Sequence, residues 1–165
     1  AQLGRLYEYV IKREKPTVVL WYGDHLPTLG NDFGVYASTG TITSTTAANW
    51  TEEEKYQMFS TPYVVFSNYD TGHEYRADDT TVSPYLLTAL MYDYIGALET
   101  LRSNFLLDLY AHCPVISPYY NLYSEGCDEE TRNKYIKLHE LLTYDDLMGE
   151  QYLTKRLLPQ EQRQE

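Results

Sequence analysis

The sequence predicts an α/β fold in which helices flank part of a central sheet. Two short runs, residues 17–22 and 63–67, are continuously apolar and carry β-branched side chains. Such runs are typical of strands covered on both faces, as in a parallel sheet. Apolar residues recur at helical spacing in the segments around these strands. A helix, a short turn and a buried strand in succession indicate the α/β class.

The first half of the chain supplies two helices and both strands. An amphipathic helix is expected over residues 3–14, where Pro16 ends it, and the first strand follows. Residues 26–50 are rich in Gly, Thr, Ser and Asn and predict a long loop, with one weak hairpin near 35–42. Thr51 followed by three glutamates predicts an N-cap and a short helix over 52–59, before the second strand.

The second half is predicted to be mainly helical. Ser83-Pro84 forms an N-cap with proline at the first helical position, and apolar spacing continues to Leu98. Further helices are expected over 101–111 and 129–142, with a last turn from Tyr144. The Gln- and Glu-rich tail, 159–165, is expected to be disordered, which leaves 1–158 as the folded part.

Composition restricts the possible partners. The 165 residues include 15% aromatics, so the chain can bury a core. Thirteen basic and 24 acidic residues give a formal charge of −11, which argues against nucleic acid and against an anionic membrane surface. No apolar run approaches the roughly 20 residues that a membrane helix needs.

The two cysteines, Cys113 and Cys127, leave the redox state open. A disulfide would close a loop of roughly 15 residues, but two cysteines are too few for a disulfide framework or a zinc site. The favoured expectation is two unpaired small side chains.

The sharpest chemical feature is Gly23-Asp24-His25, directly after the first strand. Ligands of open α/β sheets lie beyond the carboxyl ends of the strands, and Gly23 makes a turn easy there. A carboxylate oxygen and an imidazole nitrogen suit Mn²⁺, Zn²⁺ or Mg²⁺. The alternative is that Asp24 caps the amides of residues 26 or 27 while His25 points into solvent.

Residues 16–27, Pro-Thr-Val-Val-Leu-Trp-Tyr-Gly-Asp-His-Leu-Pro, resemble the metal-binding strand of the sulfatase and alkaline phosphatase superfamily. The resemblance is to the branch of phosphoglycerol transferases that includes lipoteichoic acid synthases. It continues in residues 60–70, in Ser83-Pro-Tyr-Leu-Leu and in residues 144–152, in the family's order.

The resemblance implies the C-terminal part of an alkaline phosphatase-like three-layer sandwich, with Asp24 and His25 as ligands of a divalent ion, most readily Mn²⁺. It implies that the nucleophilic Thr and other ligands lie upstream of Ala1, so this chain holds no catalytic nucleophile of its own. It further implies a bacterial membrane protein whose catalytic domain faces the outside.

The implied substrate is a phospho- or sulfo-ester of the cell envelope. Some lipoteichoic acid synthases carry a Ser four residues after the metal-binding His; Leu29 stands there in this chain, with Thr28 before it as a candidate substrate contact. This departure counts against phosphoglycerol as the substrate and leaves a related phospho- or sulfo-ester open. A non-catalytic accessory or binding module that kept the fold is the alternative to an enzyme.

Two further expectations concern association and minor sites. The missing half of the domain should leave apolar surface at a sheet edge, which invites a homo-oligomer. Other candidate positions are expected to be surface, capping or packing residues rather than sites; they are His73-Glu74, Asp78-Asp79, His112 beside Cys113, His139 and Asp145-Asp146.

Overall fold

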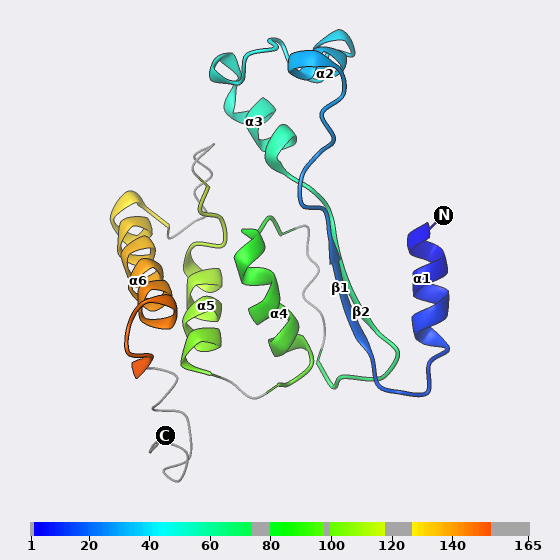
Figure 1. Ribbon diagram of the computed structural model, residues 1–165, viewed down its shortest axis with the longest axis vertical. Coiled ribbons are helices and arrows are strands. Elements are labelled where there is room, and N and C mark those ends of the chain that lie inside the picture. The colour runs from blue at the N-terminus through cyan, green and yellow to red at the C-terminus, as the bar shows by residue number, and fades with distance from the viewer. Residues whose placement is uncertain (1, 74–79, 98–99, 118–126, 153–165) are drawn as a thin grey trace. The chain divides into compact units, whose positions relative to one another are not determined.

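The computed structural model describes residues 2–73, 80–97, 100–117 and 127–152, which divide between two compact units (Figure 1). Unit 1 contains residues 1–70 and 117–122, and unit 2 contains the rest. Helices and strands are both present, so the mixed α/β class is confirmed. The three-layer sandwich and the extent of the folded part stay predictions, and the tail lies outside the described residues.

Unit 1 is built on a two-stranded sheet of β1 (Val18–Tyr22) and β2 (Tyr63–Ser67). The strands pair antiparallel, with Val18 opposite Ser67 and Tyr22 opposite Tyr63. The parallel sheet expected from the apolar runs is therefore wrong for this pair. An apolar run does not set strand direction, and here the chain between the strands turns back so that β2 runs against β1. The expected burial on both faces is also wrong for β1, which is half-buried over Val18–Leu20 and exposed at Trp21 and Tyr22.

Helix α1 (Gln2–Ile11) packs against this sheet through one face. The ring of Tyr7 meets the ring of Phe66 edge-on, with 5.3 Å between centroids, and Val10 is buried. The helix ends at Ile11, a few residues before Pro16, close to the predicted position. Asn68, which follows β2, joins the end of that strand to the segment before β1. Its side-chain amide donates to the carbonyl of Lys15, and its side-chain oxygen accepts from the amide of Thr17.

The excursion between the strands carries α2 (Gly34–Ser38) and α3 (Glu52–Phe59) at its far end (Figure 1). Ile42, Trp50 and Met58 form a small buried cluster there. The hairpin expected near 35–42 is wrong, because α2 occupies its first half. Ile42, at the other end of the expected hairpin, is instead a buried member of this cluster.

Glu54 holds the loop before α3 in place. Its carboxylate accepts hydrogen bonds from the backbone amides of Thr51, at 2.8 Å, and of Thr43, while Thr51 caps the Glu54 amide in return. This reciprocal capping box confirms the predicted N-cap and the predicted helix. The hydrogen bond from the Thr51 amide lowers the pKa of Glu54; burial opposes this shift and the Thr43 bonds add to it.

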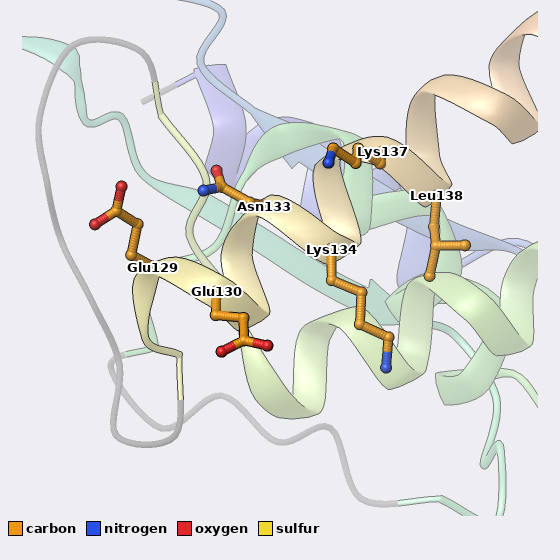
Figure 2. Close-up of a pocket in the computed structure, with 6 residues that line it drawn as sticks. All are labelled: Glu129, Glu130, Asn133, Lys134, Lys137 and Leu138. Carbon is orange, nitrogen blue, oxygen red and sulfur yellow. The ribbon is translucent and has the colours of Figure 1, made fainter.

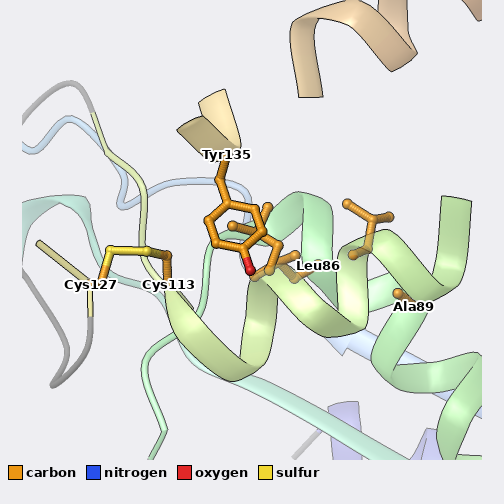
Figure 3. Close-up of a cluster of buried hydrophobic side chains, with 7 residues drawn as sticks. Leu86, Ala89, Cys113, Cys127 and Tyr135 are labelled. Carbon is orange, nitrogen blue, oxygen red and sulfur yellow. A yellow bond between two sulfur atoms is a disulfide. The ribbon is translucent and has the colours of Figure 1, made fainter. Parts of the chain in front are cut away.

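Unit 2 is a group of three helices that lie side by side (Figure 1). A 3₁₀ turn (Pro84–Leu86) leads into α4 (Leu87–Tyr94), followed by α5 (Leu101–His112) and α6 (Glu129–Leu147). Figure 3 shows their shared core, whose buried members are Leu86, Ala89, Leu106, Leu109, Cys113, Cys127 and Tyr135.

The helix predicted from Ser83 to Leu98 stops early. α4 ends at Tyr94, and Gly96 adopts a left-handed conformation with φ of 61° that ends the helix. Leu98 lies outside the described residues. At the other end of the unit, α6 extends to Leu147, beyond the predicted limit. Asp146 in its last turn forms an ion pair with Arg102 of α5.

The two cysteines form a disulfide, which corrects the expectation that they are unpaired. Cys113 follows α5 and Cys127 precedes α6, and their Cα atoms lie 5.1 Å apart. Both are buried in the core (Figure 3). Sequence spacing could not reveal this, because the pairing depends on how α5 and α6 pack against each other.

Apolar side chains are exposed where β1 ends. Trp21 and Tyr22 keep 39% and 49% of their surface accessible. The association expected at the sheet edge stays a prediction. Each helix within the described residues is too short or too polar to cross a membrane.

Removal of the disulfide should destabilise unit 2. The double variant Cys113→Ser/Cys127→Ser should lose about 3 kcal/mol of unfolding free energy, because the unfolded chain regains the freedom of a loop of this length. Urea unfolding followed by circular dichroism measures this. A reductant should weaken the wild-type chain and leave the variant unchanged; equal stability of the reduced and oxidised wild type would contradict the prediction.

Glu54 should make the stability of unit 1 acid-sensitive. Its pKa is lower in the folded than in the unfolded state, so its contribution is complete above the usual value of about 4.5 and is lost as the pH falls through the folded pKa. Urea unfolding at a series of pH values should show Glu54→Gln less stable than wild type at neutral pH. The difference should shrink below the usual value; a difference independent of pH would contradict this.

Candidate functional site

Asp24 and His25 lie together immediately after β1, as the sequence predicted for a metal site. The Nε2 atom of His25 is 3.5 Å from Oδ2 of Asp24. Both side chains are open to solvent, with exposed fractions of 75% and 84% for His25 and Asp24. The two side chains therefore lie on the same side of the chain and do not diverge to opposite faces.

Local hydrogen bonds orient both groups. Oδ1 of Asp24 accepts from the backbone amide of His25 at 2.9 Å, which turns Oδ2 toward the imidazole. Nδ1 of His25 is 2.9 Å from the carbonyl oxygen of Leu26. When Nδ1 carries the hydrogen and donates it there, the lone pair of Nε2 is left available beside Oδ2.

This donor pair fits one divalent ion. Oxygen and nitrogen ligands lie at ~2.0–2.2 Å from Mn²⁺ or Zn²⁺, so neighbouring ligands of one ion are roughly 3 Å apart. The separation of 3.5 Å between Nε2 and Oδ2 is close to that value. The capping alternative places Asp24 on the amides of residues 26 or 27, whereas the carboxylate accepts from the amide of His25.

The chain at Gly23 approaches Thr61 and Pro62 closely, and we call this close approach the neck. It sets the direction in which Asp24 leaves the sheet. The hydroxyl of Thr61 donates to the carbonyl of Gly23 at 2.6 Å, and the amide of Gly23 donates to the carbonyl of Pro62 at 3.1 Å. A Cβ atom at position 23 would stand 2.9 Å from Cβ of Thr61. Glycine is therefore required here for close approach of the two chain segments.

The segment that follows His25 is fastened to α2. The hydroxyl of Tyr36 donates to the carbonyl of Pro27 at 2.7 Å, and the amide of Val35 donates to the carbonyl of Leu29 at 3.3 Å. Thr28 lies between these two anchors and is exposed. The structure brings Asp24 and His25 together, while Thr28 lies farther along the same surface segment.

The described residues contain no group of three or more His, Cys, Asp or Glu side chains placed to hold a metal ion. Asp24 and His25 are thus two candidate ligands without a third in that part of the chain. Glu74 and Asp78-Asp79, two of the minor candidates, lie outside the described residues. His73 is exposed.

His112 and Cys113 do not form a nucleophile pair, because the disulfide occupies the sulfur of Cys113. His112 instead belongs to a network that the sequence analysis missed. The hydroxyl of Tyr135 donates to Oδ2 of Asp108 at 2.7 Å and lies 3.1 Å from Nδ1 of His112. The spacing of Asp108 and His112, four residues apart on one helix, was the available signal.

This network fastens α6 to α5. Burial raises the pKa of Tyr135 to about 12, and the hydrogen bond to Asp108 and its negative charge act in the same direction. The phenol therefore keeps its proton at neutral pH and acts as a donor between the two helices. A group held in this form is suited to packing rather than to proton transfer.

The remaining minor candidates have structural partners. His139 lies beside the ring of Tyr85, with 5.0 Å between ring centroids, and burial lowers its pKa, as does the charge of Arg102. Asp146 forms an ion pair with Arg102. Asp145 accepts from the amide of Tyr152 at 3.3 Å and so caps the turn after α6, as predicted.

Comparison with curated proteins gives one distant relative. The chain is 28% identical over 161 residues to a "Putative cyclic beta-1,2-glucan modification protein" of Rhizobium meliloti (strain 1021). The match covers 93% of this chain but 24% of that protein, so the chain spans about a quarter of the relative's length. No family model and no solved structure matches the chain.

A side chain at position 23 should displace the candidate site. Gly23→Ala forces a Cβ against Cβ of Thr61 and should lower the unfolding free energy by about 1–3 kcal/mol, as overpacking does. Gly34→Ala is the matched control, because nothing lies within 4 Å of its Cβ position. Thermal unfolding measures both; equal behaviour of the two variants would contradict the tight neck.

Proposed function

We propose that the chain is the C-terminal part of a metal-dependent, sulfatase-like phosphoglycerol transferase or phospho- or sulfo-ester hydrolase. In this proposal the chain forms a portion of a three-layer sandwich, and the remaining sheet and helices belong to the preceding part of a longer protein. In this proposal the isolated chain is inactive, because the nucleophile lies in that preceding part.

The proximity of Asp24 and His25 at the end of β1 is the observation that carries the proposal. An exposed carboxylate and an exposed imidazole, 3.5 Å apart and oriented by Nδ1 and Oδ1 contacts to the backbone, offer one oxygen and one nitrogen to the same ion. The ion that suits this donor set best in the proposed reaction is Mn²⁺, with Zn²⁺ or Mg²⁺ as alternatives.

The roles of this chain's residues follow from their positions. A bound divalent ion supplies Lewis-acid stabilisation of negative oxygen atoms on a phosphate or sulfate ester. Asp24 and His25 would hold that ion, and in the tautomer in which Nδ1 donates to the carbonyl of Leu26, the lone pair of Nε2 would face it. Gly23 and Thr61 fix the point at which both side chains leave the sheet. Thr28, exposed on the same segment, is the candidate contact to the substrate.

The proposed substrate belongs to the cell envelope. The relative in Rhizobium meliloti is named for modification of a cyclic glucan, which supports an envelope polymer or glycolipid as the acceptor. The buried disulfide supports an oxidising compartment, and therefore the outer side of the membrane, because structural disulfides persist in such places. The negative charge of the chain remains unsuited to nucleic acid.

The proposed partner of unit 1 is the rest of the catalytic domain. The two-stranded sheet exposes Trp21 and Tyr22 at the end of β1. A further strand or helix from the preceding half would cover this apolar surface, and in its absence a second copy associating through the sheet edge would do so.

Metal binding tests the site directly. Titration of the chain with Mn²⁺, followed by loss of the electron paramagnetic resonance signal of the free ion, should show weak saturable binding. Asp24→Ala and His25→Ala should each abolish it, and Asp93→Ala, an exposed carboxylate on α4, should not. Unchanged Mn²⁺ binding in both site variants would refute the assignment.

Activity measurements separate the fragment from the whole protein. With Mn²⁺ and p-nitrophenyl phosphate or sulfate, the 165-residue chain should give background rates. In a longer protein that carries the preceding half, Asp24→Asn should reduce kcat by roughly 100-fold or more, since even changes around metal ligands cost 10–100-fold. Turnover by the isolated chain that disappears in Asp24→Ala would refute the fragment assignment.

A further inference from the structure

The surface hollow on α6 does not favour one class of ligand (Figure 2). Its lining residues in the described part of the chain come from this one helix, and Glu129 and Glu130 stand beside Lys134 and Lys137. Ligand sites are usually concave and combine apolar walls with a few precisely placed polar groups. In unit 1, by contrast, several segments converge on the chain that follows His25.

Residues 26–33, which we call the strap, are fastened at both ends to the buried cluster around Trp50. The side chains of Leu26 and Phe33 pack against this cluster. The ring of Phe33 meets the ring of Trp50 edge-on, with 5.1 Å between centroids. Residues 27–32 between these two anchors are exposed. The strap is therefore held by its ends and open to solvent along its middle.

The backbone at the second anchor is strained. Asp32 and Phe33 have positive φ angles of 50° and 59°. This left-handed conformation is a genuine outlier for a bulky residue such as phenylalanine. A strained backbone of this kind persists only where the surrounding contacts over-determine it. The contact of the Phe33 ring with Trp50 is therefore an anchor that holds the strap against its own backbone preference.

The anchored strap fixes the carbonyl group of Leu26, whose oxygen lies 2.9 Å from Nδ1 of His25. The side chain of Leu26 packs on the cluster, and the proline that follows restricts the backbone of both residues. On α2, the hydroxyl of Tyr36 donates to the carbonyl of Pro27 at 2.7 Å, while the Tyr36 ring packs on the same cluster. The acceptor for the imidazole is thus held from both sides.

We infer that Tyr36 and Phe33 are positioning residues for His25. They hold the carbonyl of Leu26 where it accepts the hydrogen on Nδ1. The neutral imidazole is thereby kept in the tautomer that leaves the lone pair of Nε2 beside Oδ2 of Asp24. The purpose of this positioning rests on the proposed metal role of His25, whereas its geometry does not require a bound ion.

Nitrogen chemical shifts of the His25 ring test the positioning without a metal. In the ¹⁵N-labelled, metal-free chain, at a pH where the ring is neutral, the shifts should show mainly the tautomer protonated on Nδ1. The His25 signals are assigned by their absence in His25→Gln.

Tyr36→Phe removes the hydroxyl and keeps the ring. It should move the ratio of the two tautomers towards Nε2 protonation by roughly twofold or more, less than loss of a whole hydrogen bond produces, because the other anchors remain. Tyr92→Phe is the matched control, since it removes the hydroxyl of an exposed tyrosine on α4, and its ratio should equal that of wild type.

The second anchor is tested by replacing the ring of Phe33. Phe33→Leu keeps an apolar side chain but loses the ring contact with Trp50, so it should move the tautomer ratio in the same direction as Tyr36→Phe. Phe33→Tyr keeps a ring and should restore the ratio of wild type. Where Phe33→Leu unfolds the unit, Tyr36→Phe decides alone, because it preserves the packing of the cluster.

Mn²⁺ titration separates this inference from the proposed function. Tyr36→Phe should weaken Mn²⁺ binding by the same factor by which it depletes the tautomer protonated on Nδ1, because only that tautomer offers Nε2. A wild type that binds no Mn²⁺ but shows the tautomer shift in Tyr36→Phe would refute the proposed function and support the positioning. Equal tautomer ratios in wild type, Tyr36→Phe and Phe33→Leu would overturn the positioning, whether or not Mn²⁺ binds.

Discussion

The neck between Gly23 and Thr61 is the constraint on which unit 1 depends. These residues are 38 positions apart in sequence, and two hydrogen bonds join their segments. A hydrogen bond contributes about 1 kcal/mol, which does not offset the entropy of closing a loop of this length. The hydrogen bonds between β1 and β2 and the buried cluster around Trp50 must offset the rest of this entropy loss. The direction of Asp24 is therefore a property of the whole unit.

The two units use different interactions to join segments that are distant in sequence. Unit 1 uses hydrogen bonds at the neck and a reciprocal cap at Glu54, whereas unit 2 uses a covalent bond between Cys113 and Cys127. Unit 2 has a small core, and small cores gain most from such a link. The bond from Tyr135 to Asp108 adds a polar contact between the same pair of helices. Together these contacts hold α6 to α5.

The sequence predicted those elements whose signals are local. An N-cap at Thr51 followed by acidic residues predicted α3, and a run of apolar β-branched residues predicted β2, both with the observed bounds. The closeness of Asp24 and His25 was also predictable, because a glycine and the end of a strand are enough to bring neighbouring side chains together.

The failures concern relations between distant segments. The direction of β2 relative to β1, the pairing of Cys113 with Cys127 and the link from Tyr135 to Asp108 depend on tertiary packing, which no local pattern encodes. The hairpin expected near 35–42 failed because burial against Trp50, and not strand pairing, accounts for the apolar residue Ile42. The helix after Ser83 was predicted too long because apolar spacing continued past Gly96, where the backbone turns left-handed.

The disulfide also changes the covalent topology of unit 2. Cys113 and Cys127 enclose the stretch between α5 and α6, so a cut in the backbone anywhere within it leaves both helices on one connected molecule. Because Tyr135 and Leu109 lie in the same buried cluster as the two sulfur atoms, the nicked chain would keep the contacts that assemble the core. A protease could therefore open this connection while the unit persists, and the break would become visible as two fragments after reduction.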